Sequence, residues 1–460
     1  MDRESLGIAT PADGTPATAV TRRGAFEALS RVAGAAGAFG LAAVGCTPGS
    51  TSAPAAGGEP SAEPVTVLFG TRGTAATKPL YEAVAKAFNE RQDRVRVELW
   101  INEPDYYTKL PVAFVGDAAP DLAYTTSRNL LPWHAKGWLA DVTAGLSRRR
   151  VRAANWFELT AQEWQIAGKQ YGAPQGWGTG VLGINKTLFQ SEGITLKPDF
   201  DATWTHDEFV SLLKQVVKVG GDGNLTQWGT DGWQAWSYFW DFGAEFLNKD
   251  KTRCVVNTPE GAAGLQWLYD LAWSHRVMPR PEPLDRTSGG NMWEAGRSGL
   301  TQNGGPHVLP RWPRDLTFDF DIAQYPIAPG RRRHHRFYSD GYIIWSGSKQ
   351  QDAALDFLAY LGTDGQAVLE QHGGRNVPAY RPVAEGVFLK GESPFTKQKW
   401  IDALKGAKPQ PLVVPFGEMT KIVNTHKDNV LAQKEAPREA VAAIEREVNA
   451  LLAQYPPPER

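Results

Sequence analysis

The alternation of short apolar runs with helical patterns is the feature that most limits how this chain can fold. Residues 65–69 (VTVLF) form a β-rich run that ends at Gly70, and residues 95–100 (VRVELW) form a second one. Between them, residues 79–89 place apolar side chains at helical spacing. A strand, a helix and a strand with short connections make a βαβ unit, which requires parallel strands. The sequence therefore predicts an α/β fold with mainly parallel sheets flanked by helices.

The same patterns continue along the chain. At 460 residues it is long enough for two or three compact units. Thr205 with Glu208 three residues later has the form of a helix-starting capping box. Further helices are predicted at 106–115, 209–219, 259–274, 352–361, 366–371 and 438–452, and further strands at 121–124, 318–323 and 341–345.

The first 45 residues are predicted to be a signal peptide rather than part of the fold. Residues 21–26 (TRRGAF) carry paired arginines that resemble a twin-arginine export signal, and a weakly apolar run follows them. Residues 41–46 (LAAVGC) resemble a bacterial lipobox, in which Cys46 would be lipidated, although Ala43 stands where a larger aliphatic residue is usual. The alternative is an ordinary cleaved signal with an incidental cysteine.

Residues 46–63 are rich in Pro, Gly, Ser and Ala and predict a flexible tether. A tether behind a lipid anchor would hold a soluble domain on the outer face of the cytoplasmic membrane. The net charge of −1 argues against a nucleic-acid partner, and the two cysteines stand in contexts too different for a structural disulfide. The histidines lack metal-ligand spacing, so neither a metal nor a cofactor is predicted.

Aromatic residues are concentrated in residues 228–246 (WGTDGWQAWSYFWDFGAEF). If a helix begins near residue 234, Trp233, Trp236 and Trp240 form one stripe and three phenylalanines form a second, about 120° away. Phenylalanines suit a core, whereas indole N–H groups need partners and suit a wetter surface such as a cleft wall. The alternative is a helix buried on both sides, and Trp240 is assigned to the core in either case.

Several segments, taken in order, resemble the bacterial extracellular solute-binding proteins of ABC importers, in particular the carbohydrate-binding group. No single segment is specific, but their order extends over most of the chain behind the lipoprotein-like signal. The segments are residues 119–122 (APDL), 137–143 (GWLADVT), 168–174 (GKQYGAP), 183–189 (GINKTLF), 203–209 (TWTHDEF), 299–306 (GLTQNGGP), 353–358 (AALDFL) and 373–378 (GGRNVP).

The resemblance implies a two-lobed flytrap fold that closes on a ligand and performs no chemistry. It places lobe 1 at 64–175 and 330–372, and lobe 2 at 176–329 and 373–454. It also implies a sugar or oligosaccharide ligand and delivery by a monomeric receptor to the permease subunits and ATPase of an importer. Two departures leave the ligand open: Ser339-Asp340-Gly341 replaces a pair of glycines before the returning strand, and His307 replaces an aromatic residue.

The ligand residues are those that the resemblance implies, carried over residue by residue. The first-lobe candidates among them each follow a strand, and ligands of open α/β sheets bind at the carboxyl ends of the strands. Asp340 and Arg375 are favoured for paired contacts to sugar hydroxyls, while Arg72 and Glu103 are alternatively solvated surface residues. The remaining candidates are Thr71, Thr125, Thr126, Gln175, Trp177, Trp233, Trp236, Asn303, His307 and Tyr342.

Two other patterns and two other functions are weighed against this interpretation. Residues 178–183 fit GxGxxG, but a strand is predicted after them where a nucleotide site needs a helix. Residues 331–336 (RRRHHR) are interpreted as a solvated turn between strands. A binding protein of the same fold for a non-sugar solute remains an alternative. A secreted glycoside hydrolase is a weaker one, since only Glu103 and Asp340 could form its carboxylate pair.

Overall fold

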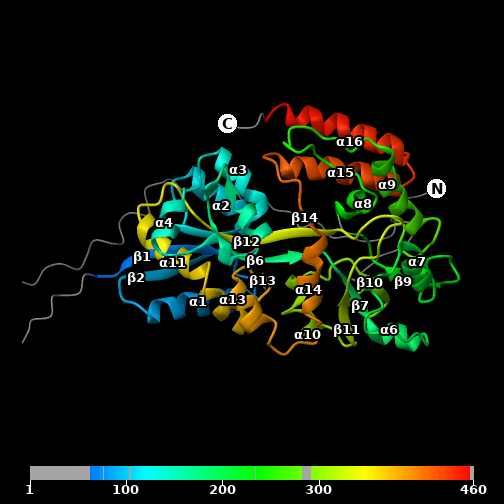
Figure 1. The fold of residues 1–460 in the computed structure, drawn as a ribbon, viewed down its shortest axis with the longest axis horizontal. Helices are drawn as coiled ribbons and strands as arrows, with labels where there is room; N and C mark the ends of the chain where they lie inside the picture. The colour runs from blue at the N-terminus through cyan, green and yellow to red at the C-terminus, as the bar shows by residue number, and fades with distance from the viewer. Residues whose placement is uncertain (1–62, 76, 103–104, 234, 282–291, 456–460) are drawn as a thin grey trace, which may run out of the picture. The chain divides into compact units, whose positions relative to one another are not determined.

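The computed structural model describes residues 63–455, apart from residues 76, 103–104, 234 and 282–291 (Figure 1). The predicted signal peptide, Cys46, the tether as far as residue 62 and the candidate Glu103 lie outside the described residues. Within the described part, no helix is both long and apolar enough to cross a membrane.

The first sheet begins with the predicted βαβ unit. Strand β1 (Val65–Thr71) pairs in parallel with β2 (Val95–Ile101), and α1 (Lys78–Glu90) connects them. Strand β1 also pairs in parallel with β3 (Leu122–Thr126), but the returning strand β12 (His335–Ile344) runs antiparallel to β3. The sheet order is β13-β6-β12-β3-β1-β2 with β14 beside β12, and its other strands are β6 (Ala173–Thr179), β13 (Val377–Pro378) and β14 (Ala407–Pro409).

The second sheet has the order β11-β7-β10-β9-β8. In it only β9 and β10 pair in parallel, while the other three pairs are antiparallel. Both sheets are therefore mixed in strand direction, where the sequence predicts mainly parallel strands. The bounds are β7 (Leu182–Asn185), β8 (Lys218–Val219), β9 (Leu225–Thr230), β10 (Ser298–Thr301) and β11 (Phe320–Ala323), with a separate hairpin of β4 (Gln165–Ile166) and β5 (Lys169–Gln170).

Most predicted helices are confirmed to within a few residues. Helix α7 (His206–Lys214) begins at the predicted capping box, in which Glu208 N–H donates to Thr205 Oγ1 and Thr205 N–H donates back to the Glu208 carboxylate. It ends before residue 219, because Lys218–Val219 forms strand β8. The other helices are α2 (Tyr106–Val115), α3 (Leu130–Ala135), α4 (Thr143–Arg148), α5 (Glu158–Glu163), α6 (Lys186–Ser191), α9 (Pro259–Ala272), α10 (Trp312–Asp315), α11 (Gln351–Leu361), α12 (Gly365–Gln371), α13 (Arg381–Val383), α14 (Gln398–Ala403), α15 (Phe416–Leu431) and α16 (Pro437–Leu452).

One helix differs substantially from its prediction. In the aromatic stretch, helix α8 covers only Ser237–Asp241, and Trp236 precedes it with a left-handed φ of 72°. The prediction of a single helix from residue 234 that carries two stripes is therefore wrong. A bulky residue rarely holds a positive φ, and such a φ is incompatible with an α-helix. The helix therefore cannot extend back through Trp236, and the tryptophan stripe is interrupted there.

Three buried clusters make up the core. One packs the first sheet against helices α1, α2 and α11, and one packs the second sheet against helices α9, α15 and α16. The third contains Trp177 on β6 and Phe337 on β12 together with Trp312 and Trp400. Strands β6 and β12 thus share a core apart from the other two clusters. The lobe boundaries stay a prediction, and β13 and β14, from the segment assigned to lobe 2, pair with the first sheet.

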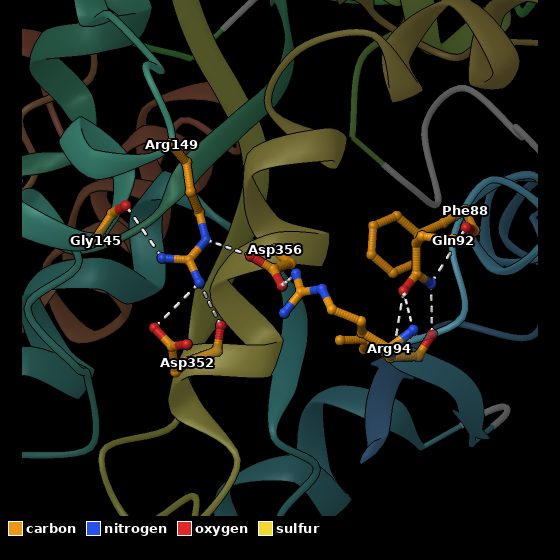
Figure 2. A network of polar contacts seen from close by, with 8 residues as sticks. Phe88, Gln92, Arg94, Gly145, Arg149, Asp352 and Asp356 are labelled. Carbon is orange, nitrogen blue, oxygen red and sulfur yellow. Dashed lines mark hydrogen bonds and ion pairs between the residues drawn. The ribbon is translucent and has the colours of Figure 1, made fainter. Parts of the chain in front are cut away.

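A charged network fastens α11 to its neighbours (Figure 2). Arg149 donates from Nε to Asp356 at 2.6 Å, and from Nη2 to the backbone oxygen of Asp352 at 2.7 Å. Arg94, just before β2, donates to the other oxygen of Asp356 at 2.6 Å. The Asp356 side chain is 19% exposed, so these charge-assisted bonds are screened less than those of a surface pair. The network joins three segments that are distant in the sequence.

Candidate functional site

The last residue of β3 and the middle of β12 bring two predicted ligand residues together. Thr126 and Asp340 are direct cross-strand neighbours, and Gly176 of β6 lies opposite Asp340 on its other side. Asp340 is half-buried and accepts a hydrogen bond from Asn376 Nδ2 at 3.0 Å. Asn376 follows Arg375 in the loop before β13, so this bond ties the Arg375 loop to the sheet end.

A cavity of about 860 Å³ lies beside these strand ends. Its first wall comes from the segment after β3 and from α2 and α3, and its second from the N-terminal end of α15 and from Tyr455. The Tyr107 ring is 38% exposed, and the Arg72 guanidinium lies 5.8 Å from its centre. The lining includes Tyr107, Thr126, Arg128, Asn129, Trp133, Val414, Pro415, Phe416, Gly417 and Glu418.

Electrostatic effects connect the cavity with the polar cluster around Asp340. Burial raises the pKa of Tyr107 to about 12; the Asp340 charge adds to the shift, while Arg72 and Arg128 oppose it. The Tyr107 hydroxyl is therefore protonated at neutral pH, and a side-chain hydrogen bond with Tyr124 also acts on it. The Asp340 charge is therefore felt at Tyr107 in the cavity wall.

Tyr338 is seated between two glycines at the same end of the fold. A Cβ on Gly178 would lie 2.3 Å from the Tyr338 ring, and a Cβ on Gly305 would lie 2.6 Å from its hydroxyl. Gly178 is the first glycine of the GxGxxG pattern, and the strand β7, not a helix, follows that pattern as predicted. Its glycine makes room for a tyrosine ring, which gives the pattern a packing role.

His307 lies half-buried beside Tyr338, with its Nδ1 3.4 Å from the Tyr338 hydroxyl. Burial, together with the charges of Arg375, Arg336 and Arg311, lowers the pKa of His307 to about 4. The imidazole is therefore neutral at physiological pH. A neutral ring has one donor and one acceptor nitrogen, which suits contact with hydroxyl groups.

Several other candidates are buried in the first or third core and make their contacts there. Gln175 is 6% exposed and accepts hydrogen bonds from the hydroxyls of Tyr342, at 2.6 Å, and Tyr81, at 3.2 Å. Thr71, Thr125 and Tyr342 are fully buried, and Trp177 is enclosed by Phe157 and Phe337. Asn303, after β10, is exposed. Thus Thr126, His307, Asp340 and Arg375 come together, while the buried candidates support the strands that carry them.

Trp233 and Trp236 lie in the core of the second sheet. Trp233 is 6% exposed, contacts His206, Phe209 and Tyr325, and lies with its indole nitrogen 3.4 Å from an Asp241 oxygen. Trp236 is 2% exposed and packs against the rings of Phe246 and Phe416. These surroundings favour the packing alternative for both rings. Phe416 also lines the cavity, so Trp236 lies behind its wall.

The residue run 331–336 splits between surface and interior. Arg331 and Arg332 are exposed, but His335 and Arg336 belong to β12, and His335 is buried with Nδ1 2.8 Å from the Gly180 oxygen. The interpretation as a solvated turn is therefore wrong for its second half. Among the described residues, no cluster of three or more His, Cys, Asp or Glu side chains could hold a metal ion.

The sequence interpretation missed several residues around the cavity. Arg128 stands two positions after the candidate Thr126, and Tyr107 is the second residue of α2, the helix after the β2 loop, so the strand-end argument could have found both. Tyr338 and Arg336 alternate with Asp340 along β12 and share its face of the strand. Nothing in the local pattern around Phe416 relates it to strands almost 300 positions earlier.

A buried carboxyl beside the site makes stability depend on pH. Glu163 accepts a hydrogen bond from the Ser339 hydroxyl, next to Asp340 on β12, and Trp164 Nε1 donates to the same hydroxyl at 3.0 Å. Burial raises the pKa of Glu163 to about 7, against the opposing effects of Ser339, Ser127 and the Lys251 charge. The folded protein therefore holds this proton more tightly than the unfolded chain does.

We expect a stabilising contribution that is complete below about pH 4 and lost as the pH rises through about 7, amounting to roughly 2–3 kcal/mol. Thermal melts of the wild type and Glu163→Gln from pH 4 to pH 8 measure it. The variant, which cannot ionise at this position, should lose less stability across that range. Parallel melting curves for the two proteins would contradict the assignment.

Comparisons with known proteins agree with this architecture. Residues 72–368 match the family model described as bacterial extracellular solute-binding protein. An ABC substrate-binding protein from Listeria monocytogenes, solved in complex with cycloalternan, has a TM-score of 0.74 at 19% identity and covers 85% of this chain and 99% of its own. A cyclic alpha-maltosyl-1,6-maltose binding protein from Arthrobacter globiformis has a TM-score of 0.70 at 23% identity, covering 85% and 100%.

A sequence relative is the arabinooligosaccharide-binding protein of Halalkalibacterium halodurans. It is 26% identical over 220 residues, which cover 44% of this chain and 45% of the relative. The structural neighbours share the two-domain α/β fold, and the family model spans well over half of the chain. The chain belongs to the bacterial extracellular solute-binding protein family.

Proposed function

We propose that this protein is an extracytoplasmic receptor that captures a sugar or oligosaccharide and delivers it to the permease of an ABC importer. The family supports capture of a solute outside the cytoplasm. Cycloalternan, cyclic maltosyl-maltose and arabinooligosaccharides are the saccharides named for the three relatives above, which supports a carbohydrate for this chain as well.

The observation that carries the proposal is the cavity with its exposed Tyr107 ring. Its volume of about 860 Å³ lies in the range of small-molecule sites. A sugar presents an apolar C–H face and a rim of hydroxyls, so it needs a flat ring and surrounding hydrogen-bonding groups. Tyr107 supplies the ring, and the rim groups of the proposed site are Arg72, Thr126, Arg128, Asn129, Asn303, His307, Asp340 and Arg375.

Binding itself is the function in this proposal, and no bond is made or broken. A ligand held by groups from both walls stabilises the closed arrangement of the two lobes more than the open one, and so raises its population. The permease then recognises the closed form.

Thermal-shift measurements on the mature protein with a saccharide panel test the proposal. A saccharide that binds only the folded state raises the melting temperature in proportion to its occupancy. We expect a shift with at least one sugar or oligosaccharide and none with peptides or polyamines. The reverse result would favour the alternative of a non-sugar solute.

We also propose that Cys46 is lipidated and holds the mature protein on the outer face of the cytoplasmic membrane. The lipobox-like residues 41–46 and the tether after them support this. Cys46→Ala should move the protein from the membrane fraction to the soluble extracytoplasmic fraction. Equal membrane retention of the variant and the wild type would show that the cysteine is not the anchor.

A further inference from the structure

Positive charge gathers around the hydroxyl of Tyr338. Three guanidiniums, those of Arg336, Arg375 and Arg128, act on this hydroxyl, and Asp340 is the carboxylate that acts on it with them. Asp340 is already bound by Asn376. Three cations and one carboxylate therefore act on this hydroxyl.

Arg336 is the most unusual member of this cluster. Its Nε is buried and has no hydrogen-bond partner, and its guanidinium lies 5.3 Å from the centre of the Tyr338 ring. No described residue forms an ion pair with it. Burial lowers the pKa of Arg336; Tyr338 opposes this shift, and the Arg128 charge adds to it.

Other buried cations of this chain have partners within reach. Lys399 lies 2.9 Å from both oxygens of the buried Asp201, and Arg149 donates to Asp356 at 2.6 Å. Lys397 donates to the Phe388 oxygen at 2.8 Å. A buried charge without an ion-pair partner destabilises a fold. Among the described residues no carboxylate pairs with Arg336, and this calls for a specific explanation.

We propose that the ligand carries an anionic substituent, a carboxylate, phosphate or sulfate on a saccharide, which binds between Arg336 and Arg128 with Arg375 at the side. This inference rests on the proposed function and names the class of saccharide. A guanidinium offers a planar set of N–H donors that fits the oxygens of these anions. The neutral His307 beside Tyr338 leaves a hydrogen-bonding group for the sugar hydroxyls.

Matched ligands that differ in one group test the inference. Calorimetric titrations would compare glucose and galactose with their uronic acids, 6-phosphates and 6-sulfates, and would compare neutral disaccharides with their uronate forms. We expect at least one anionic form to bind about tenfold or more tightly than its neutral parent, because a hydrogen-bonded charge contributes on that scale. The preferred anion identifies the source of the charge. Raising the salt concentration should lower the affinity for the anionic ligand and leave the affinity for the neutral one nearly unchanged.

Arg336→Gln should remove most of the preference for the anionic form while retaining affinity for the neutral parent. Because Arg336 is partly buried, the exposed Arg128→Gln provides a second variant whose fold is not at risk, and a severalfold loss of preference is expected. Arg148→Gln, an exposed arginine on α4, is the control and should leave the preference unchanged.

The outcomes separate this inference from the proposed function. Binding of neutral and anionic saccharides with equal affinity overturns the anionic assignment and leaves the receptor function standing. A preference for anions that survives in both variants overturns the assignment to this cluster. If no saccharide of either kind binds, the proposed function fails and the inference fails with it.

Discussion

Trp233→Ala is expected to lower the free energy of unfolding by about 3–5 kcal/mol, the usual cost of removing a large buried aromatic side chain. The Trp233 ring is 6% exposed and contacts Phe209, Trp267 and Tyr325, so its removal leaves a cavity that these rings cannot fill without moving. Denaturant unfolding followed by circular dichroism measures the loss. Val219→Ala, on the exposed strand β8, is the control and should change stability by less than about 0.5 kcal/mol.

The same variant decides between the two interpretations of the aromatic stretch. If Trp233 lined the ligand site, Trp233→Ala would keep the stability of the wild type and lose affinity. That result would overturn the core assignment made from the burial of the ring. Loss of stability with affinity unchanged in the folded fraction supports the core assignment.

The aromatic stretch shows why periodicity alone was insufficient there. The spacing of Trp233, Trp236 and Trp240 fits one helical face, but the helix contains only Ser237–Asp241 and the backbone of Trp236 adopts positive φ. Local spacing describes a helix only if the backbone stays helical, and a single left-handed residue separates the stripes. By contrast, α2 and α9 were predicted well. Each buries apolar side chains in a core; α2 ends before Gly116, and α9 begins with Pro259 after the N-cap Thr258.

Some residues of the candidate site could be predicted from local sequence, whereas others reach the site only through tertiary packing. The family resemblance located Asp340, and the rule that ligands bind at strand ends located Thr126, which the sheet register places opposite Asp340. That rule also selected Thr71 and Thr125, whose side chains turn inward, because a one-residue step along a strand reverses the face. The α15 wall was not predicted, since tertiary packing alone brings Phe416 to the strands of the first sheet.

The sequence patterns likewise did not predict the direction of every strand. The βαβ unit at the N-terminus does predict parallel pairing of β1 with β2 and β3. Strand β12, however, enters the same sheet from a segment more than 200 residues later and runs antiparallel to β3. An apolar run indicates that a segment is a strand and not which neighbour it joins.

Tyr107→Ala should weaken binding of the saccharide with the largest thermal shift by about 10- to 30-fold, the effect typical of an aromatic residue at the centre of a binding site. The ring is 38% exposed, so its removal costs the fold little, and the loss should appear in affinity rather than in stability. Isothermal titration calorimetry measures the affinity, and thermal melts without ligand measure the stability. Tyr107→Phe keeps the ring and should retain most of the affinity.

Val112→Ala is the matched control for Tyr107→Ala, because Val112 lies on the same helix, is 68% exposed and is not part of the cavity lining. It should leave both affinity and stability unchanged. If Tyr107→Ala binds the saccharide as the wild type does, the ligand does not occupy this cavity. The strand-end cluster around Asp340 would then have to hold the ligand without the α2 wall, and the proposed site would shrink to the residues beside Tyr338.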